Sequence, residues 1–151
     1  MWRLFVIPVL IWLVVVIARP PFLFPEEAML GAVWKGDTPS VQRLLRQGVP
    51  VETRDPGARG TLLITAARRG HVETTRVLLE AGANADAQNI FGNSALLLAT
   101  EVEHPEVVRL LLRHGANPNI RSKRGQTPLS CALKDNDLEM ARLLKKAGAR
   151  E

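Results

Sequence analysis

The sequence is poor in the side chains that enzymes use for acid–base and nucleophilic chemistry. Its 151 residues include one cysteine (Cys131), no tyrosine and three histidines. A single cysteine excludes an intramolecular disulfide in any compartment. A phosphate-binding loop and a Gly-x-Ser-x-Gly nucleophile motif are also absent from the sequence. These absences argue against an enzyme.

A strong excess of one charge sign is missing as well. The chain has 20 basic and 15 acidic residues, a formal net charge of +5. This excess is too weak to indicate a nucleic-acid partner by itself. A stabilising role at a membrane surface is an alternative, but lipid recognition usually clusters several basic residues in one segment, and here they are dispersed.

The longest apolar run lies at the N-terminus. Residues 4–18 contain no charge, and Arg3 precedes them. This pattern is typical of a secretory signal, because a membrane-spanning helix needs about 20 apolar residues. We predict that residues 1–19 form a hydrophobic helix that is either a cleaved signal sequence or a retained membrane anchor. In both cases the rest of the chain is exported, either periplasmic or anchored in the inner membrane with the folded part outside.

Three prolines in residues 20–25 predict a linker that stops the apolar helix. The remainder repeats itself. Glycines at positions 48, 82, 115 and 148 are spaced by 34, 33 and 33 residues, and each follows an amphipathic segment such as TTRVLLEA. A preceding helical segment carries alanines at 32, 66, 99 and 132, with the same spacing. The second segments begin at Asp37, His71, His104 and Asp137.

A unit of two helices, a tight turn and a glycine stop, repeated every 33 residues, predicts a stacked solenoid. The unit resembles the ankyrin repeat, whose pattern is roughly G-x-T-P-L-x-x-A-A-x-x-G-H followed by V-V-x-L-L-L-x-x-G-A. Residues 125–149, GQTPLSCALKDNDLEMARLLKKAGA, match this pattern best, and residues 60–83 also match well. The third repeat departs from it, because Glu103 stands at the glycine between the helices. The histidine that usually follows Thr-Pro-Leu in ankyrin repeats is absent throughout, with Ile64, Leu97 and Ser130 in its place.

The resemblance implies an all-α ankyrin-repeat solenoid, built of helix-turn-helix units with hairpin-like fingers. The predicted domain covers residues 26–151, with four repeats at about 26–55, 56–89, 90–122 and 123–151. The architecture is also similar to small exported bacterial ankyrin proteins.

The two ends of the array differ from its middle. In the inner repeats an apolar trio such as Val77-Leu78-Leu79 recurs, whereas the first repeat has Arg43-Leu44-Leu45 and the last has Leu143-Leu144-Lys145. End repeats have one face in water, so a charge at a different member of the trio at each end is the pattern of caps. We therefore expect a monomeric array.

The histidines do not predict a metal site. His71 and His104 occupy the same place in consecutive repeats, and His114 lies at a helix end. A metal site needs three or four converging ligands, and no cysteine or carboxylate shares their spacing in the right way. Cys131 lies beside Ala132 on a first helix, where a small buried thiol packs like an apolar residue. We predict no metal, no cofactor and no catalytic residue; an enzyme that uses Cys131 is the disfavoured alternative.

The resemblance implies a binding surface, because ankyrin domains usually bind protein partners with their fingertips and with the exposed ends of the first helices. By position, the fingertip residues here are Ile90, Phe91, Asn93, Lys123, Arg124 and Gln126. The ends of the first helices are Trp34, Lys35, Arg68, Arg69, Glu101, Val102, Lys134 and Asp135.

Two of these residues have open alternatives. One of Ile90 and Phe91 either stays in solvent or folds back on the neighbouring finger, and Trp34 either joins the binding surface or covers the outer end of the first repeat. The sequence predicts a non-enzymatic module that holds, protects or inhibits a protein partner. The basic residues around Phe91 favour an acidic partner.

Overall fold

The computed structural model describes residues 24–150; the predicted signal or anchor and most of the predicted linker lie outside this range. The described residues form eight helices and no strand. The first helices of the four units are α2 (Pro25–Lys35), α4 (Leu62–Arg68), α6 (Ala95–Glu101) and α8 (Pro128–Lys134). The second helices are α3 (Thr38–Arg46), α5 (Val72–Glu80), α7 (Pro105–Arg113) and α9 (Leu138–Lys146). The all-α prediction is confirmed for this part of the chain.

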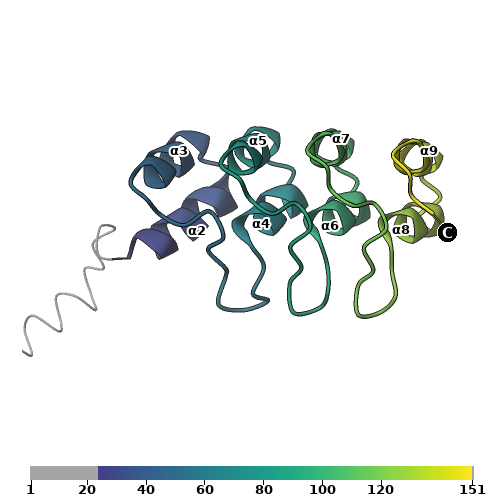
Figure 1. The fold of residues 1–151 in the computed structure, drawn as a ribbon, viewed down its shortest axis with the longest axis horizontal. Helices are drawn as coiled ribbons and strands as arrows, with labels where there is room; N and C mark the ends of the chain where they lie inside the picture. Colours follow the sequence, from purple (N-terminus) through teal and green to yellow (C-terminus); the bar gives the residue numbers. More distant parts are fainter. Residues whose placement is uncertain (1–23, 151) are drawn as a thin grey trace, which may run out of the picture.

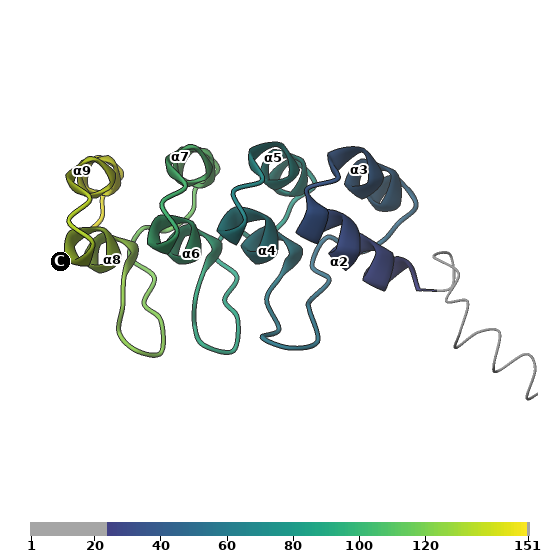
Figure 2. The ribbon, with the colours of Figure 1, turned by 180° about the vertical axis from the view of Figure 1, so that it is seen from behind.

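The helices form two layers, which Figures 1 and 2 show from opposite sides. The first helices lie side by side in one layer and the second helices in the other. A hairpin-like finger joins α3 to α4, α5 to α6 and α7 to α8, and all the fingers project from the layer of first helices. The fingers and the ends of the first helices therefore share one side of the molecule.

Local sequence explains where the helices begin. Asp37 and Asp137 accept hydrogen bonds from the backbone N–H groups of Ser40 and Met140, and thereby cap α3 and α9. Among the first helices, Thr127 and Ser130 cap each other's backbone at the start of α8. Pro25, predicted to end the linker, is instead the first residue of α2, since proline suits the first turn of a helix.

A continuous apolar core runs through the stack. Leu78, Leu111 and Leu144, at equivalent places in the second helices, are completely buried. Ala66 and Ala99 are completely buried between the first helices, where the absence of a longer side chain lets α4 and α6 pack closely. At the ends, Arg43 and Lys145 are exposed where the inner repeats have apolar residues that are buried or, at Leu112, partly buried. Their exposure agrees with their expected capping role.

The fingers are tied to one another by backbone hydrogen bonds. The N–H of Ile90 donates to the carbonyl of Ala58 (3.0 Å), and the N–H of Lys123 donates to the carbonyl of Phe91 (3.0 Å). Side chains at equivalent positions add a second series near the base of the fingers. The side-chain oxygens of Glu52, Asp86 and Asn119 accept from the backbone N–H of Asn84 (2.7 Å), Asn117 (2.8 Å) and Arg150 (2.8 Å) in the following repeat. These links hold each finger against the next.

One side chain shapes each fingertip. Asn89 accepts from the N–H groups of Phe91 and Asn93, and Ser122 accepts from those of Arg124 and Gln126. Asp55 has the same place in the first finger, which contains one extra residue. It accepts from Gly57 N–H (2.9 Å) and Gly60 N–H (2.6 Å). The extra residue is thus accommodated within the tip.

Candidate partner-binding groove

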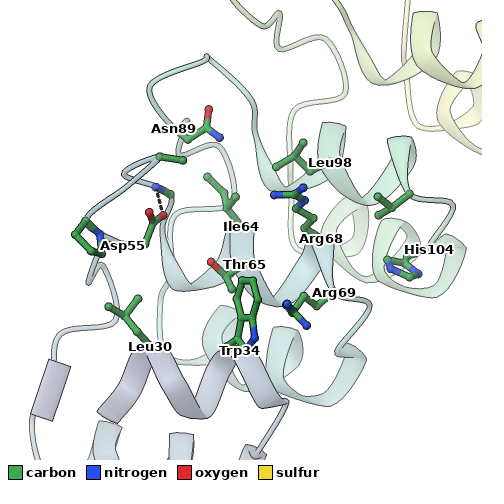
Figure 3. A pocket seen from close by; sticks show the side chains of 14 residues that line it. Leu30, Trp34, Asp55, Ile64, Thr65, Arg68, Arg69, Asn89, Leu98 and His104 are labelled. Carbon is green, nitrogen blue, oxygen red and sulfur yellow. Dashed lines mark hydrogen bonds between the residues drawn. The ribbon is translucent and has the colours of Figure 1, made fainter. Parts of the chain in front are cut away.

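Within residues 24–150, two hollows lie on the finger side of the molecule. The larger, which we term the proximal groove, encloses about 720 Å³ between α2, α4, the end of α6 and the first finger (Figure 3). The smaller, the fingertip pocket, encloses about 270 Å³ between the second and third fingers and the end of α6. The proximal groove holds Trp34, Arg68, Arg69 and Val102, and the fingertip pocket holds Phe91, Asn93, Glu101, Lys123, Arg124 and Gln126.

Trp34 and Arg69 join the first two repeats across the proximal groove. The guanidinium carbon of Arg69 lies 3.2 Å from the centroid of the Trp34 ring, and Figure 3 shows the two side chains face to face. Trp34 nevertheless keeps 56% of its surface exposed. A cation–π contact of this kind contributes about 0.5–1 kcal/mol at an exposed site. The alternative that Trp34 covers the outer end of the first repeat is wrong, because its ring lies against the second repeat.

The proximal groove carries positive charge. The guanidinium group of Arg68 has neither a hydrogen bond nor an ion pair among the described residues, and that of Arg69 has only its contact with Trp34. Asp55 is the one acidic residue that lines the groove, and both of its carboxylate oxygens accept backbone N–H groups of its own finger. Its charge therefore offsets the two guanidinium groups only through space.

The fingertip pocket presents an aromatic side chain on a fixed backbone. Phe91 is 55% exposed and Ile90 is 43% exposed, so both side chains keep a large part of their surface in solvent. The backbone of Phe91 is held on both sides, because its N–H donates to Asn89 and its carbonyl accepts from Lys123. Glu101 lies in the same pocket as Lys123 and Arg124, so this pocket has mixed charge.

Four of the predicted residues, Lys35, Ile90, Lys134 and Asp135, line neither of these two hollows. Lys35 lines a third hollow of about 550 Å³ at the outer end of the first repeat, with Arg43 and Gln47. Lys134 and Asp135 are exposed at the end of α8 and line none of the three hollows. A role of these residues in partner binding stays a prediction.

The apolar floor of the proximal groove was not predicted. It consists of Leu30, Ile64 and Leu98, together with Val102 at its edge. A signal for it existed, since Ile64 occupies the position where the repeat pattern has a histidine after Thr-Pro-Leu. An apolar residue there replaces a polar one at the bottom of the groove.

Cys131 and His71 both lie in surroundings that are typical of residues with a structural role. Cys131 is buried, and its burial raises the pKa of the thiol, which disfavours the reactive thiolate. The ring Nε2 of His71 lies 3.2 Å from the backbone carbonyl oxygen of Trp34 in the preceding repeat.

Within residues 24–150, no three His, Cys, Asp or Glu side chains gather so that they could hold a metal ion. In the same range, no helix is long and apolar enough to cross a membrane.

Comparison with known families decides what the stack is. A family model described as "Ankyrin repeats (3 copies)" matches residues 29–122 and, in a second overlapping match, residues 78–150. The chain belongs to the ankyrin repeat family. Comparison with curated proteins gives no match. Ankyrin repeats indicate a protein–protein interaction module, and the resemblance seen in the sequence is confirmed.

Proposed function

We propose that these ankyrin repeats bind an acidic protein partner through their finger side, with Phe91 inserted into a pocket of that partner. The observation that carries the proposal is the state of Phe91: its backbone is fixed by two hydrogen bonds while 55% of the side chain is exposed. A fixed aromatic side chain loses little conformational entropy on binding, which is why such residues are frequent interface anchors.

Charge supports an acidic partner. Arg68, Lys123 and Arg124 are exposed on the same side of the molecule as Phe91, and no ion pair is formed by any of them within the described residues. Exposed charges around an anchor mainly accelerate association with a partner of opposite charge. The sequence further supports display of the repeats outside the cytoplasmic membrane, where the module holds, protects or inhibits its partner, because Arg3 and the uncharged residues 4–18 precede the repeats.

Photo-crosslinking tests the role of Phe91 in the full chain. A photoreactive amino acid is placed at position 91 or, as a control, at Leu138, whose side chain is equally exposed (55%) at the start of α9. We expect a crosslinked protein at position 91 and none at position 138, with the partner identified by mass spectrometry. The purified partner then allows the affinity to be measured.

Phe91→Ala should weaken that affinity by about 2 kcal/mol, which is about a thirtyfold increase in Kd. Leu138→Ala should leave Kd unchanged. If Leu138 crosslinks the partner and Phe91 does not, the partner binds another surface and the proposal fails.

The location is tested separately, with a periplasmic phosphatase fused to the C-terminus. We expect an active phosphatase, because that enzyme requires export. An inactive phosphatase, together with an active cytoplasmic reporter at the same position, would place the repeats inside the cell.

A further inference from the structure

The proximal groove combines two features that the fingertip pocket lacks. Its floor is apolar, formed by Leu30, Ile64 and Leu98, and its volume of about 720 Å³ is in the range of sites that enclose a ligand side chain. Its rim carries Arg68 and Arg69, without a counter-ion that is free to pair with them. A ligand for this groove must therefore offer both an apolar group and a negative charge.

The geometry of the two arginines favours a carboxylate. Arg69 is stacked on Trp34, which positions its guanidinium plane and leaves its N–H groups at the edges of that plane. Arg68, one residue earlier at the end of α4, points into the groove beside Leu98 (Figure 3). Each guanidinium group offers the planar, bidentate hydrogen bonding that suits a carboxylate.

The surroundings of Asp55 explain why this acidic residue forms no ion pair with Arg68 or Arg69. Its two carboxylate oxygens accept the N–H groups of Gly57 and Gly60, which keep the side chain turned toward its own fingertip. The inter-finger hydrogen bond from Ile90 N–H to Ala58 O holds that fingertip against the next finger. An external carboxylate therefore meets arginines that no internal acid has already bound.

We propose that the proximal groove binds an extended segment of the partner protein in which a bulky apolar residue adjoins Asp or Glu. The apolar side chain packs on Leu30 and Ile64 beneath the Trp34 ring, and the acidic side chain binds Arg68 and Arg69 at the rim. This inference rests on the proposed function, and it adds the chemistry that the partner must carry. Anionic lipid is the less suitable occupant, because lipid headgroups are usually bound by clusters of about 4–8 basic residues and this groove has two.

Selection of peptides on the full chain tests the proposal. Random linear peptides displayed on phage are selected on the immobilised full-length protein, and the most enriched peptide is synthesised. We expect the enriched sequences to place Asp or Glu next to Leu, Ile, Phe or Trp. Replacing that acid with its amide should raise Kd about tenfold or more, because the charge-assisted hydrogen bonds are lost.

Variants of the groove then locate the site. Arg68→Glu/Arg69→Glu should raise the Kd of the acidic peptide about tenfold or more, and Trp34→Ala should raise it by a smaller factor. The matched control is Arg109→Glu/Arg113→Glu, which makes the same change of charge at two exposed arginines of α7, in the layer of second helices. This control should leave Kd unchanged. Far-UV circular dichroism verifies that each variant is folded.

Three results would overturn the proposal: enrichment of peptides without an acidic residue, equal effects of the two arginine pairs, or no enrichment at all. Binding of vesicles that contain anionic lipid, lost in Arg68→Glu/Arg69→Glu and accompanied by no peptide enrichment, would assign the groove to a membrane instead. None of these results affects crosslinking at Phe91. Failure of the groove and failure of the proposed function can thus be told apart.

Discussion

The junctions between repeats follow two different rules. At the first two junctions the turn between the two helices of a repeat contains a glycine, Gly36 or Gly70. The histidine of the following repeat lies directly over this glycine. A Cβ atom on either glycine would come within 2.7 Å of the ring of His71 or His104. At the third junction Glu103 has this position, with a φ of 56°.

The following repeat explains why a side chain is possible there. At the place of His71 and His104, the last repeat has Asp137, whose side chain turns back to cap α9 by accepting from Met140 N–H (2.9 Å). No imidazole therefore covers residue 103. Glycine in the turn of one repeat and histidine before the second helix of the next repeat therefore form a pair, and the third junction has neither member.

The largest expected effect comes from breaking an intact pair. Gly70→Ala should lower the free energy of unfolding by about 2–4 kcal/mol, because alanine pays for the left-handed conformation at φ 73° and its methyl group meets His104. Urea unfolding followed by far-UV circular dichroism measures this. The matched control is Glu103→Ala. Because Glu103 already has a Cβ atom, this change should shift the midpoint of urea unfolding little.

The origin of that loss can be separated further. In a His104→Ala background, Gly70→Ala should lower the free energy of unfolding by only about 1–2 kcal/mol. The contact with the imidazole is then absent, and only the strain of the left-handed backbone remains. Equal costs in the two backgrounds would mean that the histidine ring does not cover the glycine.

A smaller change in the free energy of unfolding is expected when the histidine alone is introduced at the third junction. Asp137→His should lower stability by about 1–3 kcal/mol, through loss of the α9 cap and contact of the imidazole with Glu103. Adding Glu103→Gly should restore the part that is due to the contact. Asp137→Asn retains a capping side chain and serves as the control; strictly additive effects of Asp137→His and Glu103→Gly would contradict the pairing.

The smallest effect is a gain. Glu103→Gly alone should raise the free energy of unfolding by about 0.5–1 kcal/mol, since glycine adopts a φ of 56° without steric cost. Asn136→Gly, at a φ of 57° in the last repeat, should give a smaller gain because asparagine tolerates this region. A loss of stability in Glu103→Gly would show that its side chain makes a contact worth more than the backbone strain.

Part of the candidate site could be predicted from the sequence. The periodicity gives Phe91, Arg68 and Arg69 a fixed position in the repeat, and the resemblance to the ankyrin family implies that these positions belong to the binding side. Lys35, Lys134 and Asp135 were included by the same rule, but Lys35 lines the hollow between α2 and α3, and Lys134 and Asp135 are exposed outside all three hollows.

The sequence by itself determined the repeat, the two helices of each unit and the start of each second helix. These features depend on residues a few positions apart, whose apolar spacing and capping groups act within one helix or turn. The tertiary structure decided which side chains meet across repeats: Trp34 stacks on Arg69, and His71 covers Gly36. Such contacts depend on how far each repeat is shifted and rotated against the next, and that displacement is set by the packing of buried side chains along the entire interface.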